Sequence, residues 1–585
     1  MKKVKFKMIS DNTFIVSEIG NKNSVGKKIY CNKFLAKIYK NENFHNKFEY
    51  EIEENFNYIL KKQRKFVPLI GNFIASNNKE IIPTKIIESI VSENIYRLLI
   101  TIKNHFDEFE KYKKNYKLNN INLKNIKYPY TLSELVDLSI SSSLFKEQIF
   151  TLYVKKFYNI KNSFDYYPNE NKKLLNKKSK FSTIIYYIEN KFFFKFLLNN
   201  FLKKIRKSQP KILIIKSYFS KKNRFLLDYY SKGKIITNNF PNYQASKTKV
   251  FKNRDQIKKN FIAEDKFDEF FLYVLENFFP RLYLEDFDEN IDSVKSFIKS
   301  NISVKSILNE SFSVDDYRLF YLKISKFYNN IKHIYIEHNC IHHPFFGSRT
   351  EELSLVPDKM FTLGWESNHF KHAKKGASLF EFKRKLKKKK YDILYISHAI
   401  QNVHHNFRNF LCGEKSLAYY ERIKNIFSKL SIDTCERITH KPYPLSKLAG
   451  VSLTLEDYCE NEFKNFKNTL DRETNALDCI VRSNCLFIDF LSTSFWQALK
   501  TGVPTVCLWH DDMQKLDVRF KDYFDELINA NILITDINNV DKIINRNFKN
   551  PYEWWNSEKV SSARNNFLAN NLCEDEIMIN KILKF

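Results

Sequence analysis

The amino-acid sequence predicts an α/β protein in which a helical N-terminal portion precedes two domains built on parallel sheets. Three observations predict this class. Residues 40–205 mostly carry apolar residues at helical spacing, residues 206–380 alternate strand-like and helical runs, and residues 391–550 repeat that alternation more regularly. Apolar and β-branched runs that are joined by helices are typical of parallel sheets covered on both faces.

The composition is that of a globular protein with more than one domain. The chain has 585 residues, which exceeds what one hydrophobic core usually organises, and 43% of them are hydrophobic. Its nine cysteines are scattered without a CxxC pair, so neither a disulfide framework nor a zinc site is indicated. Since no signal-peptide core and no apolar run of membrane-spanning length is visible, we expect a soluble or peripheral protein of the cytoplasm.

The net charge of +31 raises nucleic acid or an anionic membrane as a partner, but the lysines are dispersed along the chain. No RNP-type, KH or zinc-finger motif is visible, so nucleic acid is not favoured. The densest basic run, Lys383–Lys390, has two interpretations that the sequence leaves open. It is an exposed linker, or it is a patch that contacts anionic lipid at the inner face of the cytoplasmic membrane.

The elements follow in chain order. The helical portion covers residues 1–205, where "IIPTKIIESIVSENIYRLLITIKNHFDEFEKYKKNY" has a clear helical period. The first domain, residues 206–380, contains the predicted strands 211–218, 332–338 and 358–365. All five tryptophans follow residue 340, and we place a domain boundary near residues 375–390.

The second domain, residues 391–550, has the more regular alternation, and a helical tail covers residues 551–585. Its predicted strands and helices are strands 392–398, 435–440, 485–490, 504–510 and 531–536, and helices 414–430 and 494–500. Ligands of such sheets bind outside the carboxyl ends of the strands. That rule selects nine residues as candidates for ligand binding: Ser397, His398, His440, Lys441, Pro442, Ser492, Thr493, Ser494 and His510.

The turn at Ser492–Ser494 connects a strand end to a helix that Gly502 ends and that Pro504 separates from the next strand. The first N–H groups of a helix lack intrahelical partners and carry partial positive charge. Hydroxyls at that position can bind phosphate oxygens where a Gly-rich loop would otherwise offer only backbone donors. The alternative, that Ser492 or Thr493 caps the helix, stays open.

A second segment, "ERITHKPYP", places His440 and Lys441 at a strand end before two prolines. The prolines hold the loop extended and remove backbone donors from it. We expect both side chains to project into the crevice, where an imidazole and a cation suit a nucleotide phosphate or ribose. A rigid loop with a solvated lysine is the alternative.

The His-Pro segment followed by the Ser/Thr-Ser helix start resembles the cytidine-nucleotide half of GT-B sialyltransferases and Kdo transferases. Further segments look like a family of bacterial surface-polysaccharide (O-antigen) transferases: "YLEDFDENI", "EHNCIHHPFFGSRTEELSLVPDKMFTLGW", "FIDFLSTSFWQALKTGVPTVCLWH" and "NPYEWWNSEKVSSARNNF". The resemblance implies a GT-B-like fold of two Rossmann-like domains that face a cleft. Residues 206–380 would be the acceptor side, residues 391–550 would bind the nucleotide sugar, and residues 551–585 would lie near the hinge.

The activity that the resemblance implies is transfer of an acidic sugar, of the nonulosonate or Kdo type, from a CMP-sugar to a surface-polysaccharide or glycolipid acceptor. CMP leaves with a single phosphate, and no DxD sequence stands at a strand end, so we expect neither a metal nor a cofactor beyond the donor. The base that deprotonates the acceptor hydroxyl is sought in one N-domain cluster. The cluster comprises Glu337, His338, His342, His343, Arg349, Glu351 and Glu352.

The sequence also departs from the family pattern, because "NCIHHPFFG" stands where relatives have a Gly-rich stretch, and His-Lys-Pro-Tyr-Pro replaces an Arg-Leu-His-Pro type of sequence. Three alternatives therefore stay open. They are a cytidine-nucleotide enzyme of the CDP-polyol phosphotransferase type, a basic RNA-binding protein, and an inactive GT-B scaffold.

Overall fold

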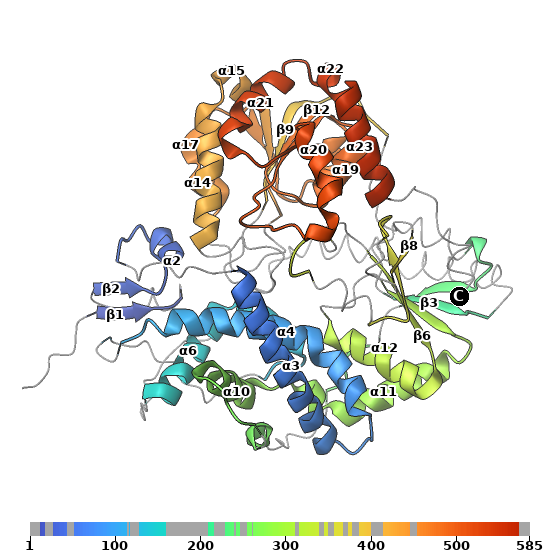
Figure 1. Ribbon diagram of the computed structural model, residues 1–585. Helices are drawn as coiled ribbons and strands as arrows, with labels where there is room; N and C mark the ends of the chain where they lie inside the picture. The colour runs from blue at the N-terminus through green and yellow to red at the C-terminus, as the bar shows by residue number, and fades with distance from the viewer. Residues whose placement is uncertain are drawn as a thin grey trace, which may run out of the picture.

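The structure is a computed structural model. It describes residues 12–17, 27–43, 52–113, 116, 128–158, 209–215, 229–238, 241–245, 254–259, 261–309, 315–337, 344–348, 356–366, 373–376, 385–398, 414–444 and 453–572. In these ranges the chain forms a helical N-terminal part and two six-stranded parallel sheets (Figure 1). Among the described residues, no helix combines the length and the apolar character that crossing a membrane requires.

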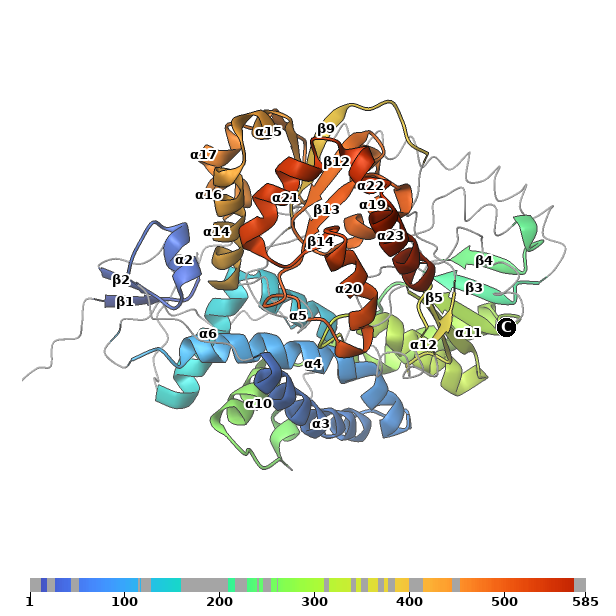
Figure 2. The ribbon, with the colours of Figure 1, turned by 45° about the horizontal axis from the view of Figure 1, so that its top comes forward.

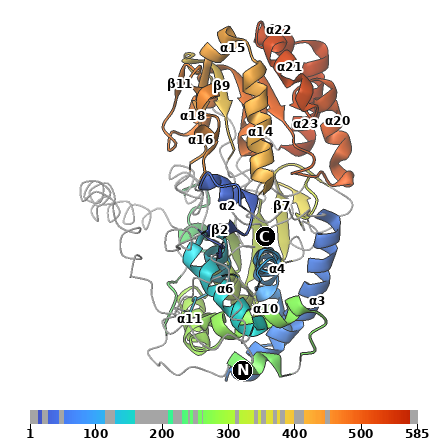
Figure 3. The same ribbon diagram turned by 90° about the vertical axis from the view of Figure 1, so that its left-hand side faces the viewer.

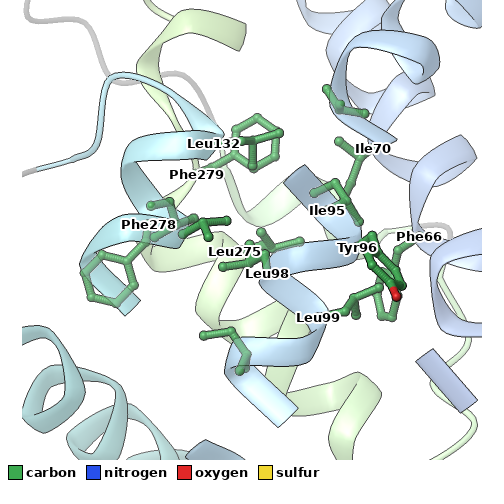
Figure 4. Packing of buried hydrophobic residues seen from close by; sticks show 14 of the residues in the cluster. Phe66, Ile70, Ile95, Tyr96, Leu98, Leu99, Leu132, Leu275, Phe278 and Phe279 are labelled. Carbon is green, nitrogen blue, oxygen red and sulfur yellow. The ribbon is translucent and has the colours of Figure 1, made fainter. Parts of the chain in front are cut away.

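Two long helices, α3 (Ile52–Asn77) and α4 (Thr84–Phe109), pack against each other and form most of the N-terminal part. Two shorter helices, α5 (Leu132–Ser141) and α6 (Ser143–Tyr158), pack on α4. Leu98 and Leu99 of α4 are fully buried in this contact, because the apolar positions of α4 recur every three to four residues. Figure 4 shows this packing; the labelled residues are Phe66, Ile70, Ile95, Tyr96, Leu98, Leu99, Leu132, Leu275, Phe278 and Phe279.

A small N-terminal unit, which the sequence analysis did not predict, consists of two short strands and a helix. The strands β1 (Asn12–Ile15) and β2 (Lys27–Tyr30) pair in parallel. The helix α2 (Lys33–Ile38) follows, and its N-cap Asn32 accepts a hydrogen bond from the Leu35 N–H. This helix contacts α14 (Glu414–Lys429) of the second domain.

The first sheet has the strand order β4-β3-β5-β6-β7-β8, with all neighbours parallel. Its strands are β3 (Ile212–Ile215), β4 (Ile235–Asn238), β5 (Ser306–Asn309), β6 (Lys332–Ile336), β7 (Lys359–Thr362) and β8 (Ala373–Lys375). Its helical elements are η3 (Arg254–Lys258), α10 (Lys266–Phe278), η4 (Arg281–Tyr283), α11 (Phe287–Ser300) and α12 (Asp316–Asn329). Leu213 and Ile215 of β3 belong to the same buried cluster as Leu98 of α4, so the helical part and the first sheet share one core.

The second sheet has the order β11-β10-β9-β12-β13-β14 and is also parallel throughout. Its strands are β9 (Tyr391–Ile396), β10 (Ile438–Lys441), β11 (Asn468–Thr469), β12 (Ser483–Ile488), β13 (Thr505–Leu508) and β14 (Leu533–Ile534). The helical elements beside α14 are α15 (Ile432–Glu436), α16 (Leu455–Tyr458), α17 (Glu460–Phe463), α18 (Ala476–Ile480), α19 (Thr493–Thr501), η6 (Val518–Phe520), α20 (Lys521–Asn529), η7 (Ile537–Asn539), α21 (Val540–Asn547), α22 (Pro551–Trp555) and α23 (Glu558–Asn571).

Helices cover both faces of the second sheet, and Figure 2 shows α14 and α23 on opposite sides of it. Successive residues of a strand point to opposite faces. In β9, Leu394 and Ile396 therefore pack with residues of α19, α20 and α23, whereas Ile393 and Tyr395 pack with residues of α14 and α21. This double coverage explains why the strands read as continuous apolar runs.

The predicted strands at 211–218, 332–338, 358–365, 392–398, 485–490, 504–510 and 531–536 are confirmed as β3, β6, β7, β9, β12, β13 and β14, and helices 414–430 and 494–500 are confirmed as α14 and α19, with ends that differ by a few residues. Residues 216–218 and 338 of these predicted strands lie outside the described residues. The strand predicted at 435–440 is wrong in its first part. Cys435 and Glu436 are the last residues of α15, because the Ser431 hydroxyl caps that helix by accepting a hydrogen bond from the Thr434 N–H. The strand itself starts at Ile438.

The carboxyl ends of the two sheets face each other. The Phe346 N–H, after β6, donates to the Lys515 carbonyl at 2.9 Å, and the Asp517 N–H, after β13, donates to the Pro344 carbonyl at 2.9 Å. Trp365, after β7, packs edge-on against Phe520 with ring centroids 6.0 Å apart. Seen from the side in Figure 3, the second sheet with its helices lies above the first part of the chain. Two Rossmann-like domains that face each other, with a helical N-terminal portion, are thus confirmed.

Candidate functional site

The strand order of the second sheet reverses between β9 and β12, since β10 and β11 lie on one side of this pair and β13 and β14 on the other. Loops that follow the two strands at such a switch point diverge, and ligands bind there. Ile396 of β9 is opposite Ile488 of β12, so both strands end at the same level. Ser397 and His398 directly follow the first strand, and Asp489 directly follows the second. The structure therefore brings the candidates Ser397 and His398 next to Asp489, a residue that lies about ninety positions further along the chain.

The N-terminus of α19 is open at this switch point. Its N-cap Ser492 has an extended backbone (φ −142°, ψ 172°), and its side chain makes no capping hydrogen bond. Ser492 is thus the N-cap residue by position, as the capping alternative with Ser492 or Thr493 expected, but its hydroxyl does not satisfy a helix N–H group. Ser492, Thr493 and Ser494 are half-buried, so their hydroxyls and the first N–H groups of the helix are accessible to an anion.

At its other end, α19 stops at Gly502, whose φ of +80° lies in the left-handed region, and the Gly502 N–H donates to the carbonyls of Ala498 and Leu499. A Cβ at Gly502 would meet no atom within 4 Å. We therefore expect Gly502→Ala to destabilise the protein by only about 1 kcal/mol, which is the cost of the backbone conformation. Denaturant unfolding followed by circular dichroism measures it; a loss several times larger would contradict this account.

A buried carboxyl group, Asp489, connects β9, α14 and the segment after β12 by hydrogen bonds. It is fully buried and accepts hydrogen bonds from the hydroxyls of Tyr395 and Tyr419 (the latter at 2.6 Å) and from the His398 N–H at 2.9 Å. Burial raises its pKa from 3.8 to about 7, although these hydrogen bonds act in the opposite direction. Strongly shifted carboxyl groups concentrate at functional sites.

Two histidines flank Asp489. The His398 ring stacks on Phe490 with centroids 4.4 Å apart, and the His510 Nε2 lies 2.9 Å from the Asp489 carbonyl oxygen. Burial lowers the pKa of both imidazoles to about 4, so both are neutral at physiological pH. Neutral rings bind a nucleotide by hydrogen bonding or stacking and do not supply a positive charge to a phosphate.

The cation beside His510 is Arg422 of α14, whose Nη1 lies 3.4 Å from the His510 Nδ1. Its guanidinium also donates two hydrogen bonds, of 2.7 and 2.6 Å, to the carboxylate of Asp512. Asp512 is therefore the ion-pair partner of Arg422. Within the described parts of the chain, no group of three His, Cys, Asp or Glu side chains is placed to hold a metal ion. Metal independence stays a prediction.

His440 and Lys441 are both buried and do not project as we expected. The His440 Nε2 lies 2.9 Å from the Ser397 hydroxyl, and burial lowers the pKa of this imidazole to about 3. The Lys441 ammonium donates to the carbonyls of Pro442 (2.6 Å) and Arg472 (2.8 Å). The physical reason is burial: an ammonium group that is removed from water needs carbonyl partners. His440 thus positions Ser397, and Lys441 fixes the loop after β10.

In the first domain, Glu337 directly follows β6 and is buried. Its Oε2 accepts hydrogen bonds from the Leu363 N–H at 3.1 Å and from the Trp365 Nε1 at 2.7 Å. This carboxylate therefore holds the turn after β7 in place. Six other residues of the predicted catalytic cluster lie outside the described residues: His338, His342, His343, Arg349, Glu351 and Glu352.

The basic run Lys383–Lys390 leads into the amino end of β9, whereas the candidate site lies at the carboxyl end of this strand. Lys383 and Arg384 are outside the described residues. The Lys387 N–H donates to the Val481 carbonyl, and the Lys389 ammonium donates to the Ser483 carbonyl at 2.5 Å. Lys385, Lys387, Lys388 and Lys390 are exposed. Contact of this run with anionic lipid stays a prediction.

The sequence analysis missed Asp489, Tyr395, Tyr419 and Arg422 as site residues. One signal was available for Asp489, because it is the single charged residue in the apolar strand segment "CLFIDF". A carboxylate in a run that must be buried on both faces needs partners. Tyr419 and Arg422 lie within a helix whose contacts only the fold reveals.

Comparison with solved structures finds low similarity. A UDP-GlcNAc 2-epimerase from Neisseria meningitidis bound to UDP-GlcNAc has 10% identity and a TM-score of 0.36, covering 64% of this chain and 100% of that chain. A structure described as the glycotransferase of kitacinnamycin has 10% identity and a TM-score of 0.34, covering 64% of this chain and 98% of that chain. None of the curated proteins that were compared matches the chain.

Comparison with family models gives a match over nearly the whole length. The model described as LIC12162 family transferase matches residues 29–584, a range that includes every site residue described above. The chain therefore belongs to the LIC12162 family of transferases.

Proposed function

We propose that the protein is a glycosyltransferase that moves an acidic sugar, of the nonulosonate or Kdo type, from a CMP-sugar to a surface-polysaccharide or glycolipid acceptor. The observation that carries this proposal is the uncapped N-terminus of α19 at the β9/β12 switch point, where three consecutive hydroxyl residues, Ser492–Ser494, surround the free N–H groups. Membership of a transferase family supports the reaction class. The resemblance of the His-Pro and Ser/Thr-Ser segments to cytidine-nucleotide sites supports the choice of CMP.

In the proposed reaction, the oxygen of an acceptor hydroxyl forms a bond to the anomeric carbon of the donor sugar. The bond between that carbon and the phosphate oxygen breaks, and CMP leaves with the electron pair. The negative charge that builds up on the leaving phosphate is stabilised by the α19 N–H groups and the hydroxyls of Ser492, Thr493 and Ser494. The neutral rings of His398 and His510 lie on either side of Asp489 at the same switch point, and the Arg422 guanidinium next to His510 is paired with Asp512.

The acceptor proton goes to a base on the first domain. Glu337 is buried and bonded to the turn after β7, so its role is to position that turn, and the base is sought among the neighbouring residues of the predicted cluster. The carboxyl ends of the two sheets face each other, so a base after β6 and a phosphate site after β12 lie on opposing sides of one interface.

A calorimetric titration of the full chain with CMP, CDP, UDP and GDP tests the donor assignment. We expect CMP to bind more tightly than UDP and GDP, because the proposed site is specific for a cytidine nucleotide with a single phosphate. Equal affinity for all four nucleotides would contradict a cytidine site. Binding of CDP with release of CMP from a CDP-polyol, and no turnover of CMP-sugars, would instead indicate the CDP-polyol phosphotransferase alternative.

The place of action that we propose is the inner face of the cytoplasmic membrane, with the exposed lysines of Lys385–Lys390 against anionic lipid. These residues lead into the amino end of β9, whereas the proposed donor site lies at the carboxyl end of that strand. A protein bound in this way would direct its donor site away from the lipid surface.

A further inference from the structure

A cavity of about 440 Å³ lies among α20, α21, α22 and α23 of the second domain. It is formed by the C-terminal ends of α20 and α21, by α22 and by the start of α23. Residues that bear on its chemistry are Arg546, Asn547, Lys549, Trp554 and Lys559.

This cavity is separate from the candidate donor site. Asn529–Asn531, which line it, directly precede β14 and therefore lie at the amino end of that parallel strand. The donor site lies at the carboxyl ends of β9 and β12. In Figure 1, α22 lies at the end of the second domain that is remote from the first domain.

The N-terminus of α23 opens onto this cavity. The helix has 14 residues, and the side chain of its N-cap Ser557 makes no capping hydrogen bond; the Ser557 hydroxyl donates to the Trp554 carbonyl at 2.8 Å. Ser557, Lys559 and Val560 line the cavity. The first N–H groups of α23 thus present partial positive charge to it.

A buried amide group also belongs to the lining of this cavity. Asn547 lines the cavity, is 2% exposed, and its Nδ2 has no hydrogen-bond partner among the described residues. The orientation of the amide is fixed, since its Oδ1 accepts a hydrogen bond from the Arg546 Nε at 3.1 Å and that nitrogen can only donate. A buried donor without a partner costs free energy, and a ligand oxygen would satisfy it.

The charges around the cavity favour an anion. Arg546, Lys549 and Lys559 line it and are exposed, and the one carboxylate in the lining, Glu553, accepts a hydrogen bond from the Asn550 Nδ2 at 3.2 Å. The basic run extends this positive region, because the Lys389 ammonium lies 5.7 Å from the ring centroid of Tyr552 in α22.

The lining also suits a sugar ring. Trp554 is partly exposed at the cavity, and the side chains of Asn529, Asn531 and Asn550 add amide groups. An indole offers an apolar face to the C–H groups of a pyranose, while amides can donate to and accept from its hydroxyls. A bare phosphate would use the cations and the helix N-terminus but not the indole or the amides.

We infer that this cavity is a second binding site, specific for a carboxylated saccharide and distinct from the donor site. The carboxylate accepts hydrogen bonds from the α23 N–H groups and the Asn547 amide, Lys549 and Lys559 contribute charge, and Trp554 packs on the ring. This inference does not rest on the proposed glycosyl transfer, because it uses none of the donor-site residues.

The test is a calorimetric titration of the full chain with a linear sialic acid trisaccharide, with the neutral maltotriose and inorganic phosphate as comparison ligands. We expect the acidic trisaccharide to bind and maltotriose not to bind. The double substitution Lys549→Ala and Lys559→Ala should weaken binding about tenfold or more, and Trp554→Ala should weaken it as well. Both lysines are exposed, so their removal should leave the thermal midpoint unchanged.

Two matched controls locate the site. Lys542→Ala removes an exposed lysine of α21 that does not line the cavity, and it should leave trisaccharide binding unchanged. Alanine at Ser492, Thr493 and Ser494 should also leave it unchanged, whether or not the donor proposal holds. Trisaccharide affinity that survives the loss of Lys549 and Lys559 would overturn the inference, as would binding that is lost only in the Ser492–Ser494 variant. Phosphate that binds as tightly as the trisaccharide, with no effect of Trp554→Ala, would also overturn the assignment to a saccharide.

Discussion

Alanine at Ser492, Thr493 and Ser494 together is expected to lower the affinity of the protein for CMP about 100-fold. A hydrogen bond contributes about 1 kcal/mol net, and the N–H groups of α19 stay in place, so the removal of three hydroxyls amounts to a loss of about 3 kcal/mol. The fold should be nearly unaffected, because Ser492 makes no capping hydrogen bond and all three residues are only half-buried. Calorimetric titration with CMP, together with the thermal midpoint, measures both effects.

The matched control for this variant is Ser428→Ala, which removes an exposed hydroxyl from α14 in the same domain. It should change neither CMP affinity nor stability. If the triple variant binds CMP as tightly as the wild type, Ser492, Thr493 and Ser494 do not bind the phosphate, and the proposed function loses its main support. A triple variant that fails to fold would instead contradict our statement that the three hydroxyls contribute little to the stability of the fold.

The second large effect concerns Asp489. Its pKa is raised from 3.8 to about 7 in the folded protein, so the folded state holds a proton that the unfolded state releases over this range. The stabilising contribution of that proton is fully present below pH 3.8 and is lost as the pH rises through about 7. At about 1.4 kcal/mol per pH unit, the loss amounts to about 4 kcal/mol.

Asp489→Asn should remove this pH dependence, because an amide is neutral like the protonated carboxyl group and cannot ionise. The hydroxyls of Tyr395 and Tyr419 can rotate to accept hydrogen bonds from the new amide nitrogen. We expect the variant and the wild type to be about equally stable near pH 3.8, and the variant to be more stable by an increasing margin up to about pH 7 and beyond. Thermal midpoints of both proteins, measured across this range, check the expectation.

Asp392→Asn is a suitable comparison, since Asp392 lies on β9, the neighbour of the strand β12 that Asp489 follows, but pairs with Arg437 at 2.7 Å. The hydrogen bond from Arg437 lowers the pKa of this carboxyl group. Its stabilising contribution is therefore present above the unfolded pKa and is lost in acid, so its removal changes the pH profile with the opposite sign. Parallel profiles for wild type and Asp489→Asn would show that Asp489 does not titrate as described.

The sequence was sufficient for those parts of the site that depend on local signals. Gly502 and Pro504 bracket the end of α19, the apolar run before Leu491 defines β12, and the hydroxyls between them mark the start of the helix. The sequence predicted the strands whose carboxyl ends form the site, but it did not predict that the strand order reverses between β9 and β12. The order of strands in a sheet depends on long-range pairing, which a local pattern does not record.

The remaining features depend on contacts between distant segments. The direction of the Lys441 side chain is set by the Arg472 carbonyl, and the pKa of Asp489 is set by burial beneath Tyr395 and Tyr419. Neither partner is adjacent in the sequence. The strand predicted from Cys435 was too long, since a hydroxyl cap at Ser431 outweighed the β-branched character of the residues that follow.

The single core that α3 and α4 share with β3 and β5 determines where the chain can be divided. A fragment that starts at residue 206 would lack the buried faces of both long helices, so the apolar side of its sheet would be left in water and aggregation would follow. A fragment that starts at residue 385 would keep both apolar clusters of the second sheet nearly complete. Recombinant dissection of this transferase should therefore cut between β8 and β9 and retain the first half as one piece.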